Sequence, residues 1–132
     1  MTSRELVQQA REALPQNLFD VASTLAWRGR IHAVRHQLKD GSRPAAITDA
    51  ILELTSSVLE LAEGANANPA IVQDHFWRYG QLKGNSVEET LEATDEILKR
   101  LLPLEPTQER QYLGDLFGII LAAEFELLAA AV

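Results

Sequence analysis

The 132-residue chain contains no cysteine, which excludes a disulfide-stabilised scaffold, a thiolate zinc site and a cysteine nucleophile. It has no glycine-rich loop of the kind that holds phosphate, and none of its serines has the strand–turn–helix context of a nucleophile elbow. No segment shows the pattern of a β-strand. The sequence therefore contains no arrangement that dictates a familiar enzyme chemistry, and no cofactor is expected.

Long hydrophobic runs are also missing. The most apolar stretch, residues 116–132, is interrupted by Glu124 and Glu126 and is shorter than a bilayer requires. The first sixteen residues are polar and mixed in charge, without the apolar core of a secretory signal. Together with the absence of cysteine, these features predict a cytoplasmic protein that contacts no membrane.

Signals for the start of a helix recur along the chain. Thr2 and Ser86 are each followed three residues later by glutamate, which is the spacing of a capping box. Polar caps or first-turn prolines precede other apolar-periodic stretches. The expected helices span about residues 3–13, 16–39, 44–63, 69–82, 87–102 and 107–130. We therefore predict an all-α fold, a single-domain antiparallel bundle of five or six helices over residues 1–132.

Apolar stripes indicate which faces of these helices are buried. The clearest stripe alternates four- and three-residue steps and comprises Ile47, Ile51, Leu54, Val58 and Leu61. The segment 87–102 is expected to bury Val87, Leu91, Leu98 and Leu101. In the segment 16–39, the first-half stripe of Leu18, Val21, Ala22 and Leu25 gives way near Gly29 to the opposite face. This change favours one long helix that packs between neighbours on both sides.

The net charge of −7 is unevenly distributed. Residues 28–43 hold five bases and one acid, whereas residues 84–132 hold ten acids and three bases. An acidic protein is a poor ligand for nucleic acid and is steered toward basic partners. We expect the basic segment to pack beside acidic helices of the same fold.

The histidines are candidates for metal binding. His32 and His36 are four residues apart on one expected helix, so both could reach one ion, with His75 or Asp74 as a third ligand. Neighbouring arginines would repel a cation, however, and the pair lies opposite the apolar stripe of its helix segment. We favour surface histidines at these two positions and a partly buried, hydrogen-bonded His75.

Arg30 and His36 enclose five residues. This spacing resembles the Arg–His motif of the HEPN-type ribonucleases, which are also small and all-helical. The resemblance implies that Arg30 would contact phosphate and that His36 would act as acid or base, at a dimer interface. The chain departs from the family pattern, because its motif lies in the first third and Ile31 directly follows the arginine.

Other residues point to protein contacts. Trp77 lies away from the apolar stripe of its expected helix, and Arg78 is adjacent to it. Exposed tryptophan and arginine are favoured anchors at interfaces. The next expected helix carries an acidic face. We predict partner contacts at Trp77, Arg78, Glu88, Glu92 and Asp95.

The last expected helix has a stripe of small residues, Gly114, Gly118 and Ala122, which allows another helix to approach closely. That helix is either internal or the same helix of a second copy, which would give a homodimer. Both interpretations predict that Gly118→Leu is disruptive through overpacking. Glu124 has three interpretations, a structural role in the core, a ligand contact and an exposed edge, of which we favour the last.

The leading hypothesis is a small acidic helical interaction module that binds another protein, as an inhibitor, immunity-type protein, antitoxin or adaptor does. It rests on the missing catalytic constellation, the acidic balance and the surplus of apolar helix surface. One alternative is an enzyme, either a HEPN-like ribonuclease or a metal-dependent hydrolase, that uses Arg30, His32 and His36. The other is a helical protein that binds a small ligand, with Trp27 and Arg30 at the mouth of its pocket.

Overall fold

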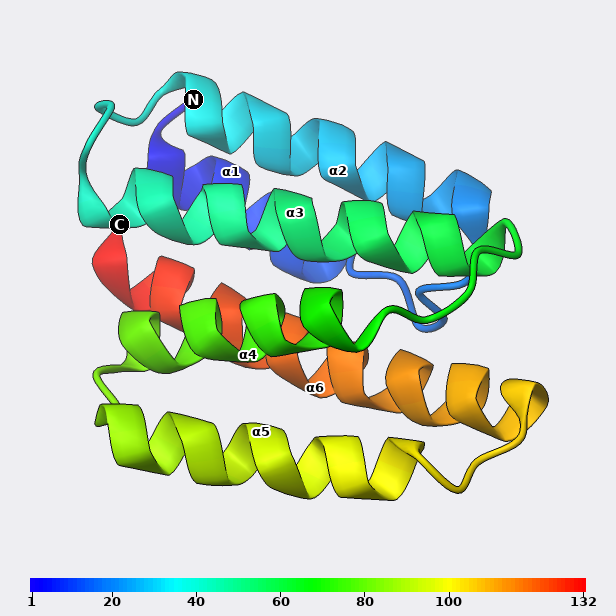
Figure 1. Ribbon diagram of the computed structural model, residues 1–132. Helices are drawn as coiled ribbons and strands as arrows, with labels where there is room; N and C mark the ends of the chain where they lie inside the picture. Colours follow the sequence, from blue (N-terminus) through cyan, green and yellow to red (C-terminus); the bar gives the residue numbers. More distant parts are fainter.

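Six helices and no strand make up the computed structural model, which describes residues 1–132 (Figure 1). The helices are α1 (Ser3–Glu12), α2 (Val21–His36), α3 (Arg43–Ala62), α4 (Pro69–Lys83), α5 (Val87–Leu101) and α6 (Pro106–Ala131). Consecutive helices run in opposite directions, which confirms the predicted all-α antiparallel bundle. Twenty buried side chains, drawn from all six helices and one loop, form a single connected apolar cluster.

The predicted caps begin the helices as expected. The hydroxyls of Thr2 and Ser86 accept hydrogen bonds from the amides of Glu5 and Glu89, at 3.1 and 3.2 Å. Each hydroxyl also donates to the carboxylate of the same glutamate. These bonds satisfy amide groups that have no partner within the helix, and they fix where α1 and α5 begin.

Helix α2 begins later than the sequence indicates. The side chain of Asp20 accepts a hydrogen bond from the amide of Ser23, so the helix starts at Val21 and the preceding residues form a loop. Its buried residues are Thr24, Trp27, Ile31 and Val34. The expected packing on both sides is wrong, because Leu25 on the first-half stripe is 51% exposed. The helix is continuous through Gly29, which is itself exposed.

Helix α3 matches its prediction closely, and all five residues of its stripe are buried. Helix α5 does not, because Val87 and Leu91 are 58% and 55% exposed. The residues that α5 buries are Thr90, Thr94, Ile97 and Leu101. A Cβ atom on Gly80 of α4 would lie 2.5 Å from the Oγ1 atom of Thr90. The two helices therefore meet too closely at this point for large side chains.

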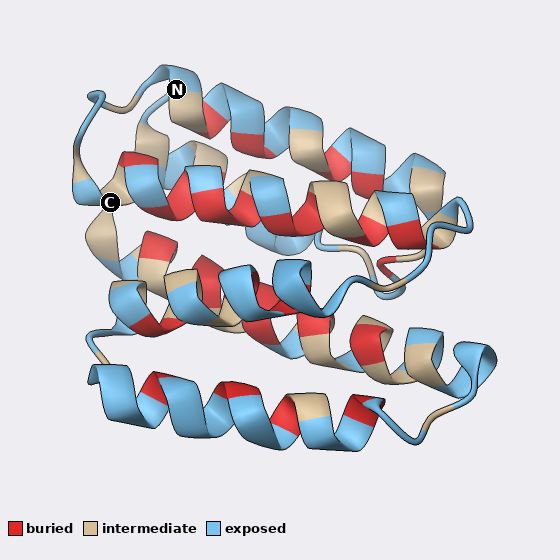
Figure 2. Ribbon diagram, in the orientation of Figure 1, coloured by how far each residue is buried: buried red, intermediate tan, exposed pale blue.

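Helix α6 is the central element. It packs against α1, α3 and α4, and its contact with α3 is the most extensive in the molecule. Trp27 of α2 also packs against α6, because the centre of its ring lies 6.0 Å from that of Phe125. The indole nitrogen of Trp27 donates a hydrogen bond to the carbonyl of Ala10 on α1 at 2.8 Å. Buried residues line the inner sides of α2, α3 and α6, with fewer along α5 (Figure 2).

Candidate functional site

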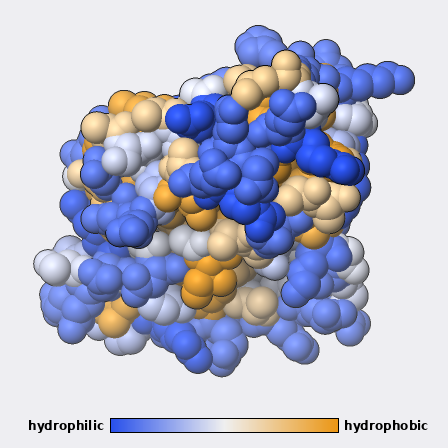
Figure 3. Space-filling model, turned by 180° about the vertical axis from the view of Figure 1, so that it is seen from behind, coloured by the Kyte–Doolittle hydropathy of each residue, from blue (hydrophilic) through white to orange (hydrophobic).

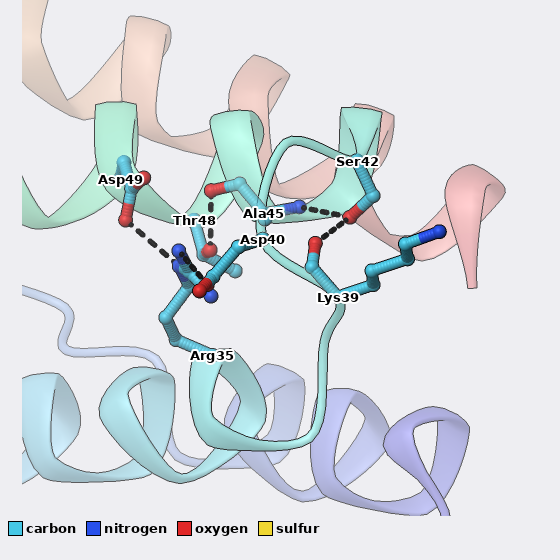
Figure 4. Close-up of polar contacts among 7 residues, drawn as sticks. All are labelled: Arg35, Lys39, Asp40, Ser42, Ala45, Thr48 and Asp49. Carbon is cyan, nitrogen blue, oxygen red and sulfur yellow. Dashed lines mark hydrogen bonds and ion pairs between the residues drawn. The ribbon is translucent and has the colours of Figure 1, made fainter.

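Three of the five bases in residues 28–43 bond to other parts of the chain. The guanidinium of Arg28 donates to the hydroxyls of Thr55 and Ser56, which ties α2 to α3. Figure 4 shows Arg35 bound to Asp40 in the connecting loop and to Asp49 on α3, at 2.8 and 3.1 Å. These bonds, first that of Asp40 and then that of Asp49, raise the pKa of Arg35 above its ordinary value.

Arg43 makes a third such link, because its guanidinium donates to the carbonyl of Leu82 on α4 at 2.7 Å. Arg28, Arg35 and Arg43 therefore join successive helices, as expected for a basic segment that packs within its own fold. Only Arg35 does so through carboxylates; Arg28 and Arg43 use hydroxyl and carbonyl oxygens.

The proposed enzymatic residues do not come together. Arg30, His32 and His36 are exposed on α2, whereas His75 is buried on α4. No group of three or more potential metal ligands occurs in the structure. Arg30 and His36 are also about 120° apart around their helix, because successive residues turn by about 100°. Within one chain, neither the metal alternative nor the ribonuclease alternative has an assembled site.

Trp27 is only 1% exposed, so it cannot stand at the mouth of a ligand pocket. Its indole N–H is already bonded to the carbonyl of Ala10. The hypothesis of a small-ligand pocket at Trp27 and Arg30 is therefore wrong in its location.

His75 forms a pair that the sequence did not reveal. Its Nε2 atom lies 2.8 Å from the hydroxyl oxygen of Ser57 on α3, and its ring packs edge-on against Phe117. Burial lowers the pKa of His75, with a smaller opposing effect from Asp74, so the imidazole is neutral near pH 7. The cavity beside Ser57 holds only about 20 Å³, which is room for a water molecule and none for a substrate. The pair therefore satisfies a buried histidine, as predicted for this residue.

Glu124 is 3% exposed, so the interpretation as an exposed edge is wrong. Burial raises the pKa of its carboxyl group to about 8, against the opposing positive charge of Arg78. This cation is on α4. Arg78 is half-buried and pairs with Glu53 on α3, so its ion pair links α4 to α3. Trp77, 37% exposed, does face solvent as expected.

The stripe of small residues on α6 faces a hollow beneath the loop between α1 and α2. The hollow measures about 650 Å³ and is lined by Leu14, Pro15, Gln16, Asn17, Leu18, Phe19, Gln111, Gly114, Asp115, Gly118, Ile119, Leu121 and Ala122. At Gly114, a Cβ atom would lie 2.6 Å from the ring of Phe19, so the internal neighbour of this glycine is a loop. At Gly118 a Cβ atom would meet no neighbouring side chain or other helix within 4 Å, so the internal neighbour that the overpacking prediction requires is missing at the Cβ position.

A groove of about 550 Å³ lies between α5 and α6. Its apolar lining comes from Ala93, Ile97, Tyr112 and Leu116, and its charged lining from Glu89, Glu92, Glu96 and Arg100. Arg100 lies 3.8 Å from Glu96. Glu89 and Glu92 take part in none of the ion pairs of the structure. Of the predicted acidic face, Glu92 lines the groove, whereas Glu88 and Asp95 are exposed on α5 outside its lining.

Sequence reasoning missed Glu89 and Glu96 as groove residues, although a signal was present. Glutamates at 89, 92 and 96 recur at three- and four-residue steps, which places them on one face of a helix. No pattern within α5 indicates that Tyr112 and Leu116 of α6 lie opposite them.

None of the helices is long and apolar enough to cross a membrane. Comparison of the chain with models of protein families, with curated proteins and with solved structures gave no match.

Proposed function

We propose that this protein is a non-enzymatic interaction module that binds a basic amphipathic segment of another protein in the groove between α5 and α6. The groove carries this proposal, because it combines an apolar lining from both helices with carboxylates at Glu89, Glu92 and Glu96. An amphipathic helix that lies in such a groove places apolar side chains on the floor and lysine or arginine beside the carboxylates. An inhibitor, an immunity-type protein, an antitoxin or an adaptor would all act in this way.

The distribution of charge supports a basic partner. Residues 84–132 hold ten acids and three bases, and this segment comprises both helices that line the groove. A concentrated negative field accelerates the encounter with a positively charged segment and disfavours acidic competitors.

The α4–α5 hairpin also exposes apolar side chains outside the lining of the groove. Trp77, Val87 and Leu91 are all large side chains that remain exposed on these two helices. Exposed apolar side chains surrounded by polar residues are typical of surfaces that bind proteins. Trp77 remains a predicted contact residue because it is exposed. The side chain of Arg78 already forms an ion pair with Glu53 within the fold.

A designed peptide tests this function. The probe is a synthetic amphipathic helix of leucine and lysine, of about 15 residues or four helical turns, and its affinity is measured by isothermal titration calorimetry. The variant replaces Glu89, Glu92 and Glu96 with glutamine, which keeps the shape of the groove and the capping geometry at residue 89. We expect the peptide to bind the variant about tenfold more weakly, because three partly exposed charge pairs at about 0.5 kcal/mol each are lost.

The matched control replaces Glu12, Glu60 and Glu63 with glutamine, since these exposed residues give the same change in net charge outside the groove. It should bind the peptide as the wild type does at 0.15 M salt. A second peptide with serine in place of leucine tests the apolar floor and should bind far more weakly. Equal loss of affinity in the two glutamine variants would contradict the proposal, because binding would then follow net charge alone.

A further inference from the structure

We propose that the hollow between the α1–α2 loop and α6 binds a second copy of this chain, so that the protein is a two-fold dimer in which the α6 helices cross. This inference is independent of the groove between α5 and α6, because the hollow and that groove share no lining residue. It predicts a property of the purified chain alone.

The shape of the surface is the first argument. Ile119 projects from α6 with 68% of its surface exposed, and Gly118 beside it leaves open space above the helix. Leu18 and Leu121 form a buried apolar floor, and Leu14 adds an exposed apolar wall. A two-fold interface requires one surface that carries both the projection and the cavity that receives it. Ile119 and the hollow at Gly118 meet this requirement within a single patch.

Charge is the second argument, and it favours a second copy of the chain over the basic partner proposed for the groove between α5 and α6. Asp115 is the only charged residue that lines the hollow, whereas the whole chain carries −7. Two copies of such a chain repel each other wherever acidic faces meet, so self-association requires a nearly uncharged surface. From behind, apolar patches lie among hydrophilic atoms on the face where α6 and α1 are foremost (Figure 3).

The register of the crossing is the third argument. In an antiparallel crossing centred between Gly118 and Ile119, Ile119 of each copy faces Gly118 of the other. Asp115 then faces Ala122, and Gln111 faces Glu126, which is already paired with Arg11 of its own copy at 3.1 Å. No carboxylate opposes another carboxylate in this register. Small residues at the crossing allow the two backbones to approach closely.

Sedimentation velocity over a range of protein concentrations tests the dimer. We expect the wild type to sediment as a dimer and Ile119→Glu to weaken dimerisation at least tenfold, because the variant places a carboxylate in an apolar contact. Leu25→Glu is the matched control, since Leu25 is an exposed leucine on α2 outside the hollow. It should leave the dimer unchanged. Circular dichroism of both variants verifies that they remain folded.

The absence of cysteine from the chain allows a second measurement. Ile119→Cys should form a disulfide-linked dimer on mild oxidation at low concentration, because both copies of residue 119 lie beside the two-fold axis; Leu25→Cys should not. A wild type that is monomeric at every concentration up to about 0.5 mM would overturn the proposal, since a specific interface binds more tightly than this. A dimer that resists Ile119→Glu, or that dissociates equally in Leu25→Glu, would overturn it as well.

Discussion

Two regions of the molecule differ sharply in how they are packed. Helices α1 to α3 bury a dense set of apolar side chains against α6, including Trp27, Ile51 and Val58. Helices α4 and α5 together bury only Val72, Ile97 and Leu101 of this kind. Since burial of apolar surface supplies most of the stability of a fold, the first region holds the bundle together. The α4–α5 hairpin contributes less to stability, and several of its large apolar side chains, including Trp77, Val87 and Leu91, remain exposed.

Polar links attach the hairpin to the rest of the bundle. His75 bonds to Ser57 on α3, and Arg78 pairs with Glu53 on α3 while lying near the buried Glu124 of α6. Hydrogen bonds and ion pairs fix an orientation more than they add net stability. The hairpin is thus positioned precisely enough to keep an open groove beside α6, without the apolar contacts that would close it.

The largest expected effect comes from Glu124→Gln, because it tests the polar link at the junction of the two regions. The pKa of this carboxyl rises from an ordinary 4.5 to about 8 on folding. Between these values the folded chain keeps a proton that the unfolded chain releases, so stability falls as pH rises. The loss reaches about 4–5 kcal/mol above pH 8, since each unit of pKa corresponds to about 1.4 kcal/mol.

Glutamine cannot ionise, so the variant should match the wild type near pH 4 and exceed it by several kcal/mol at pH 9. Urea unfolding across this pH range measures the difference. Glu126→Gln on the same helix is the control, because Glu126 is exposed, and its effect should stay below about 1 kcal/mol. His75 acts in the opposite direction, since its lowered pKa reduces stability as pH falls below 6.5. A constant difference between Glu124→Gln and wild type at all pH values would exclude an ionisable buried carboxyl.

The second prediction compares one residue type in the two regions. Ile51 on α3 is fully buried, and Ile97 on α5 is 9% exposed. We expect Ile51→Ala to lower the free energy of unfolding by about 4 kcal/mol and Ile97→Ala by about 2 kcal/mol, because the denser site leaves the larger cavity. Urea unfolding at one pH measures both. Equal losses would show that α5 is packed as tightly as α3, which would contradict the comparison.

The sequence predicted the packing of α3 correctly and that of α5 incorrectly, and the threonines of α5 explain the difference. In α3 five large apolar residues form one continuous stripe, and all five are buried. In α5 the buried stripe includes Thr90 and Thr94, whose hydroxyls donate to the carbonyls of Ser86 and Thr90 at 3.0 and 2.8 Å. A threonine that is satisfied within its own helix can be buried without an external partner. Local hydrophobicity therefore selected Val87 and Leu91, while the shape of the neighbouring helix selected the threonines.

The candidate sites were predicted in part. The small residues of α6 and the acidic residue Glu92 do line grooves. The grooves themselves depend on where α5 and the α1–α2 loop stand relative to α6, which no pattern within one helix encodes. The burial of Glu124 was similarly hidden, because a carboxylate in line with apolar residues is consistent with either an edge or a core position.

The smallest expected effect compares two helical glycines and tests the close approach of α4 and α5. Gly29 on α2 has open space where a Cβ would lie, so Gly29→Ala should raise the free energy of unfolding by up to about 1 kcal/mol through helix propensity. At Gly80 the same methyl group would lie 2.5 Å from Oγ1 and 3.0 Å from Cγ2 of Thr90. Gly80→Ala should therefore lower stability by about 1 kcal/mol, since overpacking outweighs the gain in propensity.

Thr90→Ala removes the two atoms that lie closest to the new methyl group, so the double variant Gly80→Ala/Thr90→Ala tests their contact. The two substitutions should be non-additive, with the double variant more stable than the sum of the single effects by at least about 1 kcal/mol. Urea unfolding of the four proteins completes this cycle. Additive effects would mean that Gly80 and Thr90 do not touch in solution. In that case α5 would be free to bury Val87 and Leu91 as its own sequence suggests, and the contrast between the two regions would lose its physical cause.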